Sequence, residues 1–404
     1  MKILIVHRYY WPDKTSCSNI IHGIAKHLAK DKHQVDVLSS QPSYFPGKNS
    51  VKQPSYELID NICVRRLALT NETHSFFWRI INAIHLGVAT LFKTSLKKYD
   101  IIIATSTPPV LNGFFSALAK ILTKAKLIYF CMDLNPEIGK VSKDFKNDIF
   151  FKFLLKLDDW ACKNSNVVLT HSKDMLKSLK QRPNGKKYNI ILMNNFSPQN
   201  LKKNKIKKLS TKYKKNKLSI IYAGNIGRFQ GLETIIDAMA LLTHRKDIEL
   251  IFVGNGTEKE KLEKKAQLKK LNIKFIKYLP IHFTKQIIRN ADIGLVTLIP
   301  KIYKYAHPSK IATYLEEGKP IICVLEKKSQ IIKDMLLQGY GFYAKFGDMH
   351  SIANLLIRLA DNNKWKKRKS QLALKYFNKY FSSKTVLNNW SKVINDLSLK
   401  NLNY

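Results

Sequence analysis

The chain has 404 residues, of which 45% are hydrophobic and 11% aromatic, so it carries enough apolar material for two or three globular domains. Lys and Arg number 70 against 29 Asp and Glu, and the net charge of +41 predicts attraction to polyanions such as anionic lipid, nucleic acid or phosphorylated substrates. Five scattered cysteines without a C-x-x-C pair argue against a disulfide framework or a zinc site.

The N-terminal half alternates between short apolar runs and amphipathic stretches. Apolar, β-branched runs predict strands at 2–7, 34–39, 101–104, 126–131, 166–170 and 189–193. Helical spacing of apolar residues predicts helices at 18–31, 74–97, 109–122, 148–163 and from Ser172 onward. Strands that alternate with helices form a parallel sheet wrapped by helices. We therefore expect a doubly wound α/β domain over residues 1–198.

Two apolar segments of this half are too short or too interrupted to cross a membrane. The N-terminal run, MKILIVHRYYWP, is shorter than the apolar part of a signal peptide and predicts a buried first strand. Residues 101–122 are apolar but include Pro108, Pro109, Asn112 and Lys120. We expect no transmembrane helix.

Residues 199–217 interrupt the alternation and predict a basic linker, because the segment is dense in lysine and lacks Asp and Glu. After it, strands are predicted at 218–223, 248–253, 273–276, 293–297 and 320–325, and helices at 231–243, 258–270, 284–289, 309–317 and 349–360. These elements predict a second doubly wound domain over 218–375, with a basic helical tail over 376–404. Ligands of such sheets bind at the carboxyl ends of the strands, and a cleft between two domains is the default site.

Two glycine-rich turns follow strands of the second domain. Residues 224–231 form the first, which includes Arg228, and residues 254–256 form the second. Glycine lets backbone approach a ligand closely, and the arginine fork suits phosphate. The alternatives are a tight turn beside a solvated arginine and a simple bend. The candidate ligand-binding residues of the two turns are Gly224, Asn225, Gly227, Gly254, Asn255 and Gly256.

A sharp helix start follows at Pro308-Ser309-Lys310. Pro is favoured where a helix begins, and Ser309 is suited to cap free backbone N–H groups. Lys310 in the first turn opposes the helix dipole at a cost of roughly a few tenths of a kcal/mol. A bound anion would offset this cost, so the pattern favours a phosphate site. The alternative is a capped surface helix whose Lys310 points to water.

In order and spacing, seven segments of the chain resemble retaining GT-B glycosyltransferases of family 4. Among these enzymes the segments are similar to bacterial fucosyl and N-acetylfucosaminyl transferases of colanic acid and O-antigen assembly. The resemblance implies two Rossmann-like domains facing an interdomain cleft, with the acceptor bound by the first and the donor by the second. It also implies that the tail packs back towards the N-terminal domain. The segments are 9–40, 100–110, 129–137, 222–238, 252–263, 289–300 and 305–322.

The resemblance implies a donor site built on the first glycine turn. Gly224, Asn225 and Gly227 would carry the donor pyrophosphate. Gln230 stands where similar enzymes have a lysine, so Arg228 and Lys310 would supply the positive charge. The helix start at Ser309 and Ile311 would present N–H groups to the phosphate.

The resemblance also places the nucleobase near the loop 254–256. The paired glutamates that similar enzymes carry eight residues apart are Tyr305 and Thr313 here. Glu316 and Glu317, one helical turn later, are the candidates to replace the missing contact to ribose, and Glu316 is counted among the expected donor-binding residues. A glutamate on the surface of the helix is the alternative.

Asp133 is the main candidate in the first domain, since it follows strand 126–131 at its carboxyl end. The string Asp-Leu-Asn-Pro-Glu resembles the surface-polysaccharide transferases, and Asp133 would bind or deprotonate the acceptor hydroxyl. Capping of the following turn is the alternative. Glu137 and His171 are secondary candidates, with a structural histidine as the other interpretation of His171.

Together these features predict a hexosyltransferase-type enzyme of cell-surface polysaccharide synthesis. It would move a sugar from a UDP- or GDP-sugar to a lipid-linked saccharide with retention of configuration and without a metal or another cofactor. Asp133, Arg228 and Lys310 would be the catalytic residues, and Arg228 and Lys310 would stabilise the leaving diphosphate.

Three segments favour attachment to an anionic membrane. The stretch 74–98 has aromatic residues at its start and basic residues at its end, and 148–163 is similar. Residues 202–217 hold nine lysines. The expected location is cytoplasmic, peripheral on the inner face of the cytoplasmic membrane. The alternative for the two helical stretches is packing in the core.

Three other functions remain open on the sequence. A nucleotide-sugar epimerase of the same architecture would need paired acids, and no second well-placed carboxylate is evident. A specific nucleic-acid-binding module would need base-stacking aromatics among the charges, and 202–217 contains only Tyr213. A transferase that binds but does not react would fit the departures at 230, 305 and 313.

Overall fold

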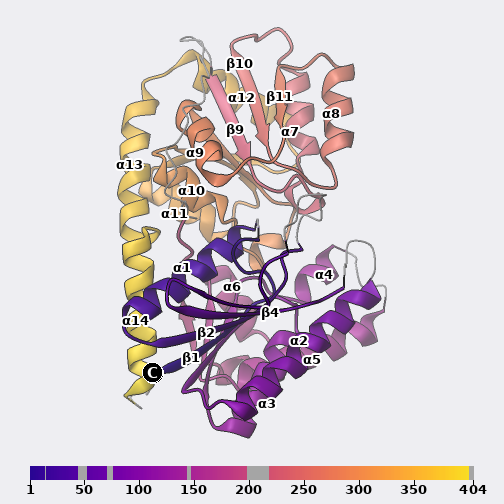
Figure 1. The fold of residues 1–404 in the computed structure, drawn as a ribbon. Helices are drawn as coiled ribbons and strands as arrows, with labels where there is room; N and C mark the ends of the chain where they lie inside the picture. The colour runs from indigo at the N-terminus through magenta and orange to yellow at the C-terminus, as the bar shows by residue number, and fades with distance from the viewer. Residues whose placement is uncertain (14, 44–51, 71–75, 143–146, 198–217, 400–404) are drawn as a thin grey trace. The chain divides into compact units, whose positions relative to one another are not determined.

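The computed structural model describes residues 1–13, 15–43, 52–70, 76–142, 147–197 and 218–399. They form two compact units (Figure 1). Unit 1 comprises Met1–Asn194, Tyr305–His307 and Val386–Tyr404, and unit 2 comprises Asn195–Lys304 and Pro308–Thr385. The expected basic linker at 199–217 lies outside the described residues.

Unit 1 contains an eight-stranded sheet in the order β3-β4-β2-β1-β5-β6-β7-β8. All neighbouring strands are parallel except β3 and β4, which form an antiparallel hairpin. The carboxyl ends of β1, β5, β6 and β7 therefore lie next to one another at one edge of the sheet. The strands are β1 (Lys2–Val6), β2 (Gln34–Ser40), β3 (Tyr56–Ile59), β4 (Ile62–Leu67), β5 (Ile101–Thr105), β6 (Lys126–Cys131), β7 (Val167–Thr170) and β8 (Ile190–Leu192).

Helices cover both faces of this sheet. The helices are α1 (Ser16–Lys30), α2 (Phe76–Leu96), α3 (Leu111–Thr123), α4 (Glu137–Val141), α5 (Asp148–Lys163), α6 (Lys173–Lys180) and α14 (Ser383–Ser398), with a 3-10 turn at Gly185–Lys187. α3 packs against β5 and β6 and contacts both α2 and α5, so these three helices lie side by side (Figure 1). α14 packs on the sheet through Trp390, whose ring centroid lies 5.3 Å from that of Phe130.

Unit 2 has a six-stranded, fully parallel sheet in the order β11-β10-β9-β12-β13-β14. The strands are β9 (Leu218–Ala223), β10 (Ile248–Val253), β11 (Ile273–Ile276), β12 (Ile293–Thr297), β13 (Ile321–Leu325) and β14 (Gly341–Lys345). The helices are α7 (Glu233–Ala240), α8 (Lys259–Leu268), α9 (Ile281–Asn290), α10 (Lys310–Glu316), α11 (Gln330–Gln338), α12 (Met349–Asp361) and α13 (Trp365–Tyr380), with 3-10 turns at Arg228–Gln230 and Ile302–Lys304.

The expectation of two doubly wound α/β domains with parallel sheets is confirmed. Strands β1, β5, β6 and β7 read as nearly continuous apolar runs because both of their faces are buried. The elements that were not predicted include the β3–β4 hairpin, α4, α11 and β14. The expected border at 375/376 falls inside α13, and the chain passes to unit 1 only after Thr385.

Candidate active site

The glycine turn after β9 is joined to the turn after β10 through the backbone. Gly224 N–H donates to the Val253 carbonyl at 2.9 Å, and Ile226 N–H donates to the Asn255 carbonyl at 2.9 Å. A Cβ on Gly254 would lie 2.0 Å from the Gly224 oxygen, and a Cβ on Gly256 would lie 2.2 Å from the Ile226 oxygen. Gly254 and Gly256 are therefore required by the close packing of the two turns.

Replacing Gly254 with alanine should separate these two turns. Its φ of +149° is unfavourable for alanine, which costs roughly 1–3 kcal/mol of stability, and the clash with Gly224 adds to this cost. Gly347→Ala is the matched control, because its φ is +81° but nothing lies within 4 Å of the new Cβ. Thermal unfolding should show the larger loss for Gly254→Ala. Equal losses would mean that the contact between the turns contributes nothing.

Lys310 lies over the first of these turns. Its Nζ is 3.7 Å from the centroid of the Tyr222 ring and would be 3.7 Å from a Cβ on Gly224. Burial lowers the pKa of the Lys310 ammonium to about 7. This side chain is thus directed onto the protein rather than into open water. A lysine so placed is predisposed to bind an anion, which would restore its charge.

The start of α10 offers fewer groups for anion binding than the sequence suggested. Ser309 occupies the N-cap position, but its side chain makes no capping hydrogen bond. α10 has only seven residues, and Ile311 in its first turn is buried. Positive charge at this place therefore comes mainly from Lys310 and not from the helix.

The other candidates of the first turn are Arg228 and Gln230. Arg228 is exposed, and its guanidinium carbon lies 5.1 Å from the Phe229 ring centroid. Gln230 folds back over the turn, where its Oε1 accepts a hydrogen bond from Gly227 N–H at 3.1 Å. The carbonyl of Gln230 also accepts from the Thr297 hydroxyl at 2.8 Å. The glutamine thus fixes the turn without adding charge.

Glu316 has a basic partner on α9. Lys285 Nζ lies 2.6 Å from Glu316 Oε2, and the neighbouring Glu317 pairs with Arg289. This pairing gives both glutamates a structural role between α9 and α10. Asn255 is exposed at the tip of the second turn, as expected for a residue beside a nucleobase or in a solvated bend.

In unit 1, Asp133 follows β6 at the edge where the strands end. Its N–H and that of Met132 donate to the Ser106 hydroxyl at 3.2 and 3.1 Å. The next N–H, of Leu134, donates to the Tyr305 carbonyl at 2.8 Å. The backbone of Asp133 is therefore held from two sides.

The Asp133 carboxyl itself remains accessible. Residue 133 is exposed, yet protein crowds its carboxyl, so desolvation raises the pKa to about 6. Burial, together with the negative charge of Asp133, raises the pKa of the Cys17 thiol to about 12. A carboxyl with a pKa near 6 suits acceptance of a proton from a hydroxyl group near neutral pH.

Histidines surround this edge of unit 1. His171 Nδ1–H donates to the Met193 carbonyl at 2.9 Å, and the ring centroid of His171 lies 6.5 Å from that of His307. His7 Nδ1 lies 2.6 Å from the Thr105 hydroxyl. Burial lowers the pKa of all three histidines, to about 3 for His7 and His307 and about 4 for His171. They are therefore neutral near pH 7, and the Nε2 atoms of His7 and His171 have no hydrogen-bond partner among the described residues.

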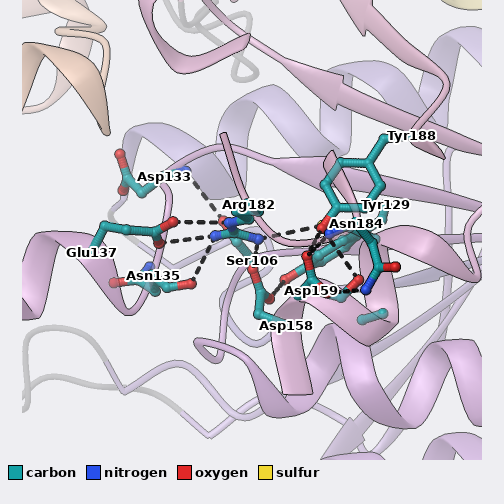
Figure 2. Close-up of polar contacts among 12 residues, drawn as sticks. Ser106, Tyr129, Asp133, Asn135, Glu137, Asp158, Asp159, Arg182, Asn184 and Tyr188 are labelled. Carbon is teal, nitrogen blue, oxygen red and sulfur yellow. Dashed lines mark hydrogen bonds and ion pairs between the residues drawn. The ribbon is translucent and has the colours of Figure 1, made fainter. Parts of the chain in front are cut away.

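A buried charge network lies behind Asp133 (Figure 2). The Arg182 guanidinium donates to both Glu137 oxygens at 2.8 and 2.9 Å and to Asp158 Oδ2 at 2.7 Å. It also reaches the Asn135 carbonyl at 3.4 Å, and Tyr129 donates to Asp158 Oδ1 at 2.6 Å. Arg182 thus holds the segment that follows Asp133. Glu137 is occupied by this ion pair, which makes it a structural residue.

Tyr305 and Thr313, the two positions where similar enzymes carry paired glutamates, fall in different units. The structure groups Tyr305–His307 with unit 1, where Ala306 pairs with Asp133 in an isolated antiparallel bridge. Thr313 is buried in unit 2 and lies 3.4 Å from the Ser197 hydroxyl. Neither position supplies a carboxylate.

Two general features of the described residues complete the site. No group of three or more His, Cys, Asp or Glu side chains in these ranges is arranged to hold a metal ion. Among the same residues, no helix has both the length and the apolar character needed to cross a bilayer.

Known glycosyltransferases are similar to this chain in sequence. Residues 202–375 match the family model "Glycosyl transferases group 1". The chain is 23% identical to the probable glycosyltransferase WbjE of Pseudomonas aeruginosa over 293 residues, which cover 68% of the chain and 72% of that protein.

Solved structures share the fold over the whole chain. One is the Anabaena protein Alr3699/HepE in complex with UDP-glucose, with a TM-score of 0.69, 15% identity and coverage of 98% of this chain and 100% of that one. Another is WaaG, a glycosyltransferase involved in lipopolysaccharide biosynthesis, with a TM-score of 0.66, 12% identity and coverage of 96% and 98%. Residues 202–375 thus match the glycosyl transferase group 1 family model, and the chain has the two-domain α/β fold of these glycosyltransferases.

Proposed function

We propose that the chain is a retaining, metal-independent glycosyltransferase of cell-surface polysaccharide synthesis. It would move a sugar from a nucleoside-diphosphate sugar to a lipid-linked saccharide. The observation that carries the proposal is the position of Lys310 over Tyr222 and the glycine turn, inside the part of the chain that matches the family model. Retention and the lipid-linked acceptor rest on the resemblance to family 4 enzymes of surface-polysaccharide assembly.

In this proposal the donor diphosphate binds at the turn 224–227. Two of its N–H groups are already engaged by backbone, so the turn contributes chiefly space at Gly224 and the N–H of Gly227. A phosphate oxygen that replaces Gln230 Oε1 would accept from Gly227. Lys310 and Arg228 would neutralise the charge that builds up on the leaving diphosphate.

Asp133 would receive the acceptor at the edge of unit 1. Its exposed carboxyl accepts a hydrogen bond from the attacking hydroxyl and is ionised above about pH 6. The neutral imidazoles of His7 and His171 offer further polar atoms at the same edge. The sugar then passes from the diphosphate to the acceptor oxygen, and the hydroxyl proton leaves to Asp133 or to the departing phosphate.

A thermal-shift screen with UDP, GDP and their sugars tests the donor site. We expect one nucleotide series to raise the melting temperature of the wild type, because a ligand that binds only the folded state stabilises it. The shift should be lost in the double variant Arg228→Ala with Lys310→Ala. The control double variant, Lys327→Ala with Arg368→Ala, replaces two exposed residues of unit 2 and should keep the shift.

Product analysis separates transfer from the epimerase alternative. An epimerase would convert the stabilising nucleotide sugar without any acceptor, whereas the proposed transferase would leave it unchanged apart from slow hydrolysis. Absence of a shift with every nucleotide would contradict the donor site. A shift that survives in the Arg228 and Lys310 variant would place the nucleotide elsewhere.

A further inference from the structure

The exposed face of α2 is mostly apolar, although Arg79, His85 and Ser95 are also exposed. Besides Trp78, five of its large apolar side chains are exposed, from 42% for Ile84 to 71% for Leu96. Their spacing of seven, four, four and four residues puts them on one side of the helix. They are Phe77, Ile84, Val88, Phe92 and Leu96. We call these five side chains the apolar band. Soluble proteins seldom expose so continuous an apolar stripe unless it binds something.

Neighbouring helices extend this surface. α5 exposes Ile149 (77%) and Phe153 (55%), which are four residues apart, and α3, which lies between α2 and α5, exposes Ile121 and Leu122 near its end. Figure 1 shows α2, α3 and α5 together on one side of unit 1. Trp78, next to Phe77 at the start of α2, is 42% exposed.

The charges around the apolar band are positive. α2 contains no Asp or Glu. Lys93 and Lys97 both pair with Asp36, whose single charge offsets only one of them. Five other cations on α2 and α5 or just after α2 are exposed and form no ion pair with another described residue. They are Arg79, Lys98, Lys152, Lys156 and Lys163.

We propose that the apolar band is the surface by which this chain lies on an anionic lipid bilayer. Apolar and aromatic side chains enter the acyl boundary, while unpaired lysines and arginines remain at the headgroups. Anionic headgroups complement the cations and the net charge of +41. A second copy of the chain would instead bring like charges together. α2 has 21 residues and is about 30 Å long. Because the apolar band runs along the length of the helix, α2 would lie parallel to the membrane surface.

The position of the band also suits a lipid-linked acceptor, a link that rests on the proposed function. α2 leads into the start of β5, and α5 leads into the start of β7. The beginnings of both helices are therefore at the carboxyl end of the sheet, the end at which Asp133 lies. Phe77, Trp78 and Ile149 would touch the bilayer on the side of unit 1 where the acceptor saccharide must arrive.

Vesicle sedimentation of the full chain tests the band. The probes are vesicles of phosphatidylglycerol and phosphatidylethanolamine in a 3:7 ratio and vesicles of phosphatidylcholine alone, at about 0.1 M salt. The band variant is Ile84→Ser with Val88→Ser and Phe92→Ser. Its matched control is Leu268→Ser with Leu337→Ser, two residues of unit 2 that are 85% and 80% exposed. A charge variant is Arg79→Gln with Lys152→Gln and Lys156→Gln.

We expect at least tenfold stronger partitioning of the wild type into the anionic vesicles than into phosphatidylcholine. The partition coefficient of the band variant into anionic vesicles should be at least tenfold lower than that of the wild type. The charge variant should bind more weakly to the anionic vesicles only. The control variant should bind like the wild type. Tryptophan fluorescence, to which Trp78 contributes, should shift to shorter wavelength when the wild type or the control variant binds anionic vesicles, and should not shift with the band variant. Nucleotide thermal shifts serve as the internal standard and should be unchanged in all variants, so failure of the band and failure of the donor site are distinguishable.

Two results would overturn the proposal. If the band variant sediments like the wild type, the membrane is bound by another part of the chain, such as the lysines of 202–217. If light scattering shows a wild-type dimer that the band variant breaks, the band is a contact between copies.

Discussion

Replacing Arg182 with methionine should lower the free energy of unfolding of unit 1 by about 3–5 kcal/mol. The residue is buried, and its guanidinium satisfies Glu137 and Asp158 at 2.7–2.9 Å. Methionine fills much of the volume but leaves two carboxylates in the interior without a cation. Thermal and urea unfolding measure the loss.

The pH dependence of this loss identifies its cause. Carboxylates that lose their cation hold protons more tightly in the folded state, so their folded pKa rises above the unfolded value. The variant should therefore recover stability relative to the wild type as the pH falls from 8 to 5. A packing defect alone would leave the difference independent of pH.

Arg245 provides the control for this experiment. It also pairs with two carboxylates, Asp247 at 2.8 Å and Asp361 at 2.6 Å, but near the surface of unit 2. Arg245→Met should cost less than about 1 kcal/mol. If both arginine variants lose the same stability, burial of the Arg182 network does not matter. If Arg182→Met loses nothing, the network is not formed in solution.

Replacing Lys310 with methionine should weaken the binding of UDP or GDP roughly 10- to 150-fold. Charge-assisted hydrogen bonds contribute about 1.5–3 kcal/mol, and the bound diphosphate would lose those made by this ammonium. Isothermal titration calorimetry measures the affinity with whichever nucleotide raises the melting temperature. The matched control is Lys327→Met, an exposed lysine of the same unit.

The same titration should show uptake of a proton. In the free protein the Lys310 pKa is lowered to about 7 by burial, so at pH 8 the amine is mostly neutral. A bound diphosphate favours the ammonium and raises this pKa, so binding at pH 8 takes up close to one proton and weakens as the pH rises above 7. At pH 6 the group is charged in both states, and Lys310 contributes no uptake.

Calorimetry in Tris and HEPES, which differ in ionisation enthalpy, counts the protons. Lys310→Met should abolish the uptake at pH 8, and Lys327→Met should keep it. Equal uptake in wild type and Lys310→Met would assign the proton to another group and remove Lys310 from the diphosphate site.

The fold was largely readable from the sequence because most of its strands are buried on both faces. β9, β10 and β12 have the predicted bounds, since a buried strand is a nearly continuous apolar run between polar turns. β11 also has the predicted bounds, although it is an edge strand and Lys274 is exposed. The β3–β4 hairpin was missed although a signal was present. Asp60 and Asn61 stand between two short alternating runs and adopt φ of +49° and +63°, as a tight hairpin turn requires.

The site was readable only in part. Lys310 was singled out from the sequence because a lysine in a first helical turn is locally unfavourable, and the structure places it over the glycine turn. The Arg182 network was missed because Glu137, Asp158 and Arg182 are more than 20 residues apart from one another, and each looks like an ordinary surface charge. Only tertiary packing brings them together. The role of Ser106 was missed for the same reason, because a serine after a strand gives no sign of the backbone that it holds.

Unit 1 is made of two parts of the chain that leave the ribosome at well separated times, because unit 2 is synthesised between them. Its sheet strands end at Leu192, but α14, with the buried Trp390 and Ile394, follows after about 190 further residues. At roughly 5–20 residues per second, the apolar face that α14 covers waits some 10–40 s during synthesis. The speed of translation through unit 2 therefore decides how long nascent unit 1 depends on chaperones. An mRNA that ends before the codons of α14 yields a product in which the face of the unit 1 sheet that α14 covers stays exposed.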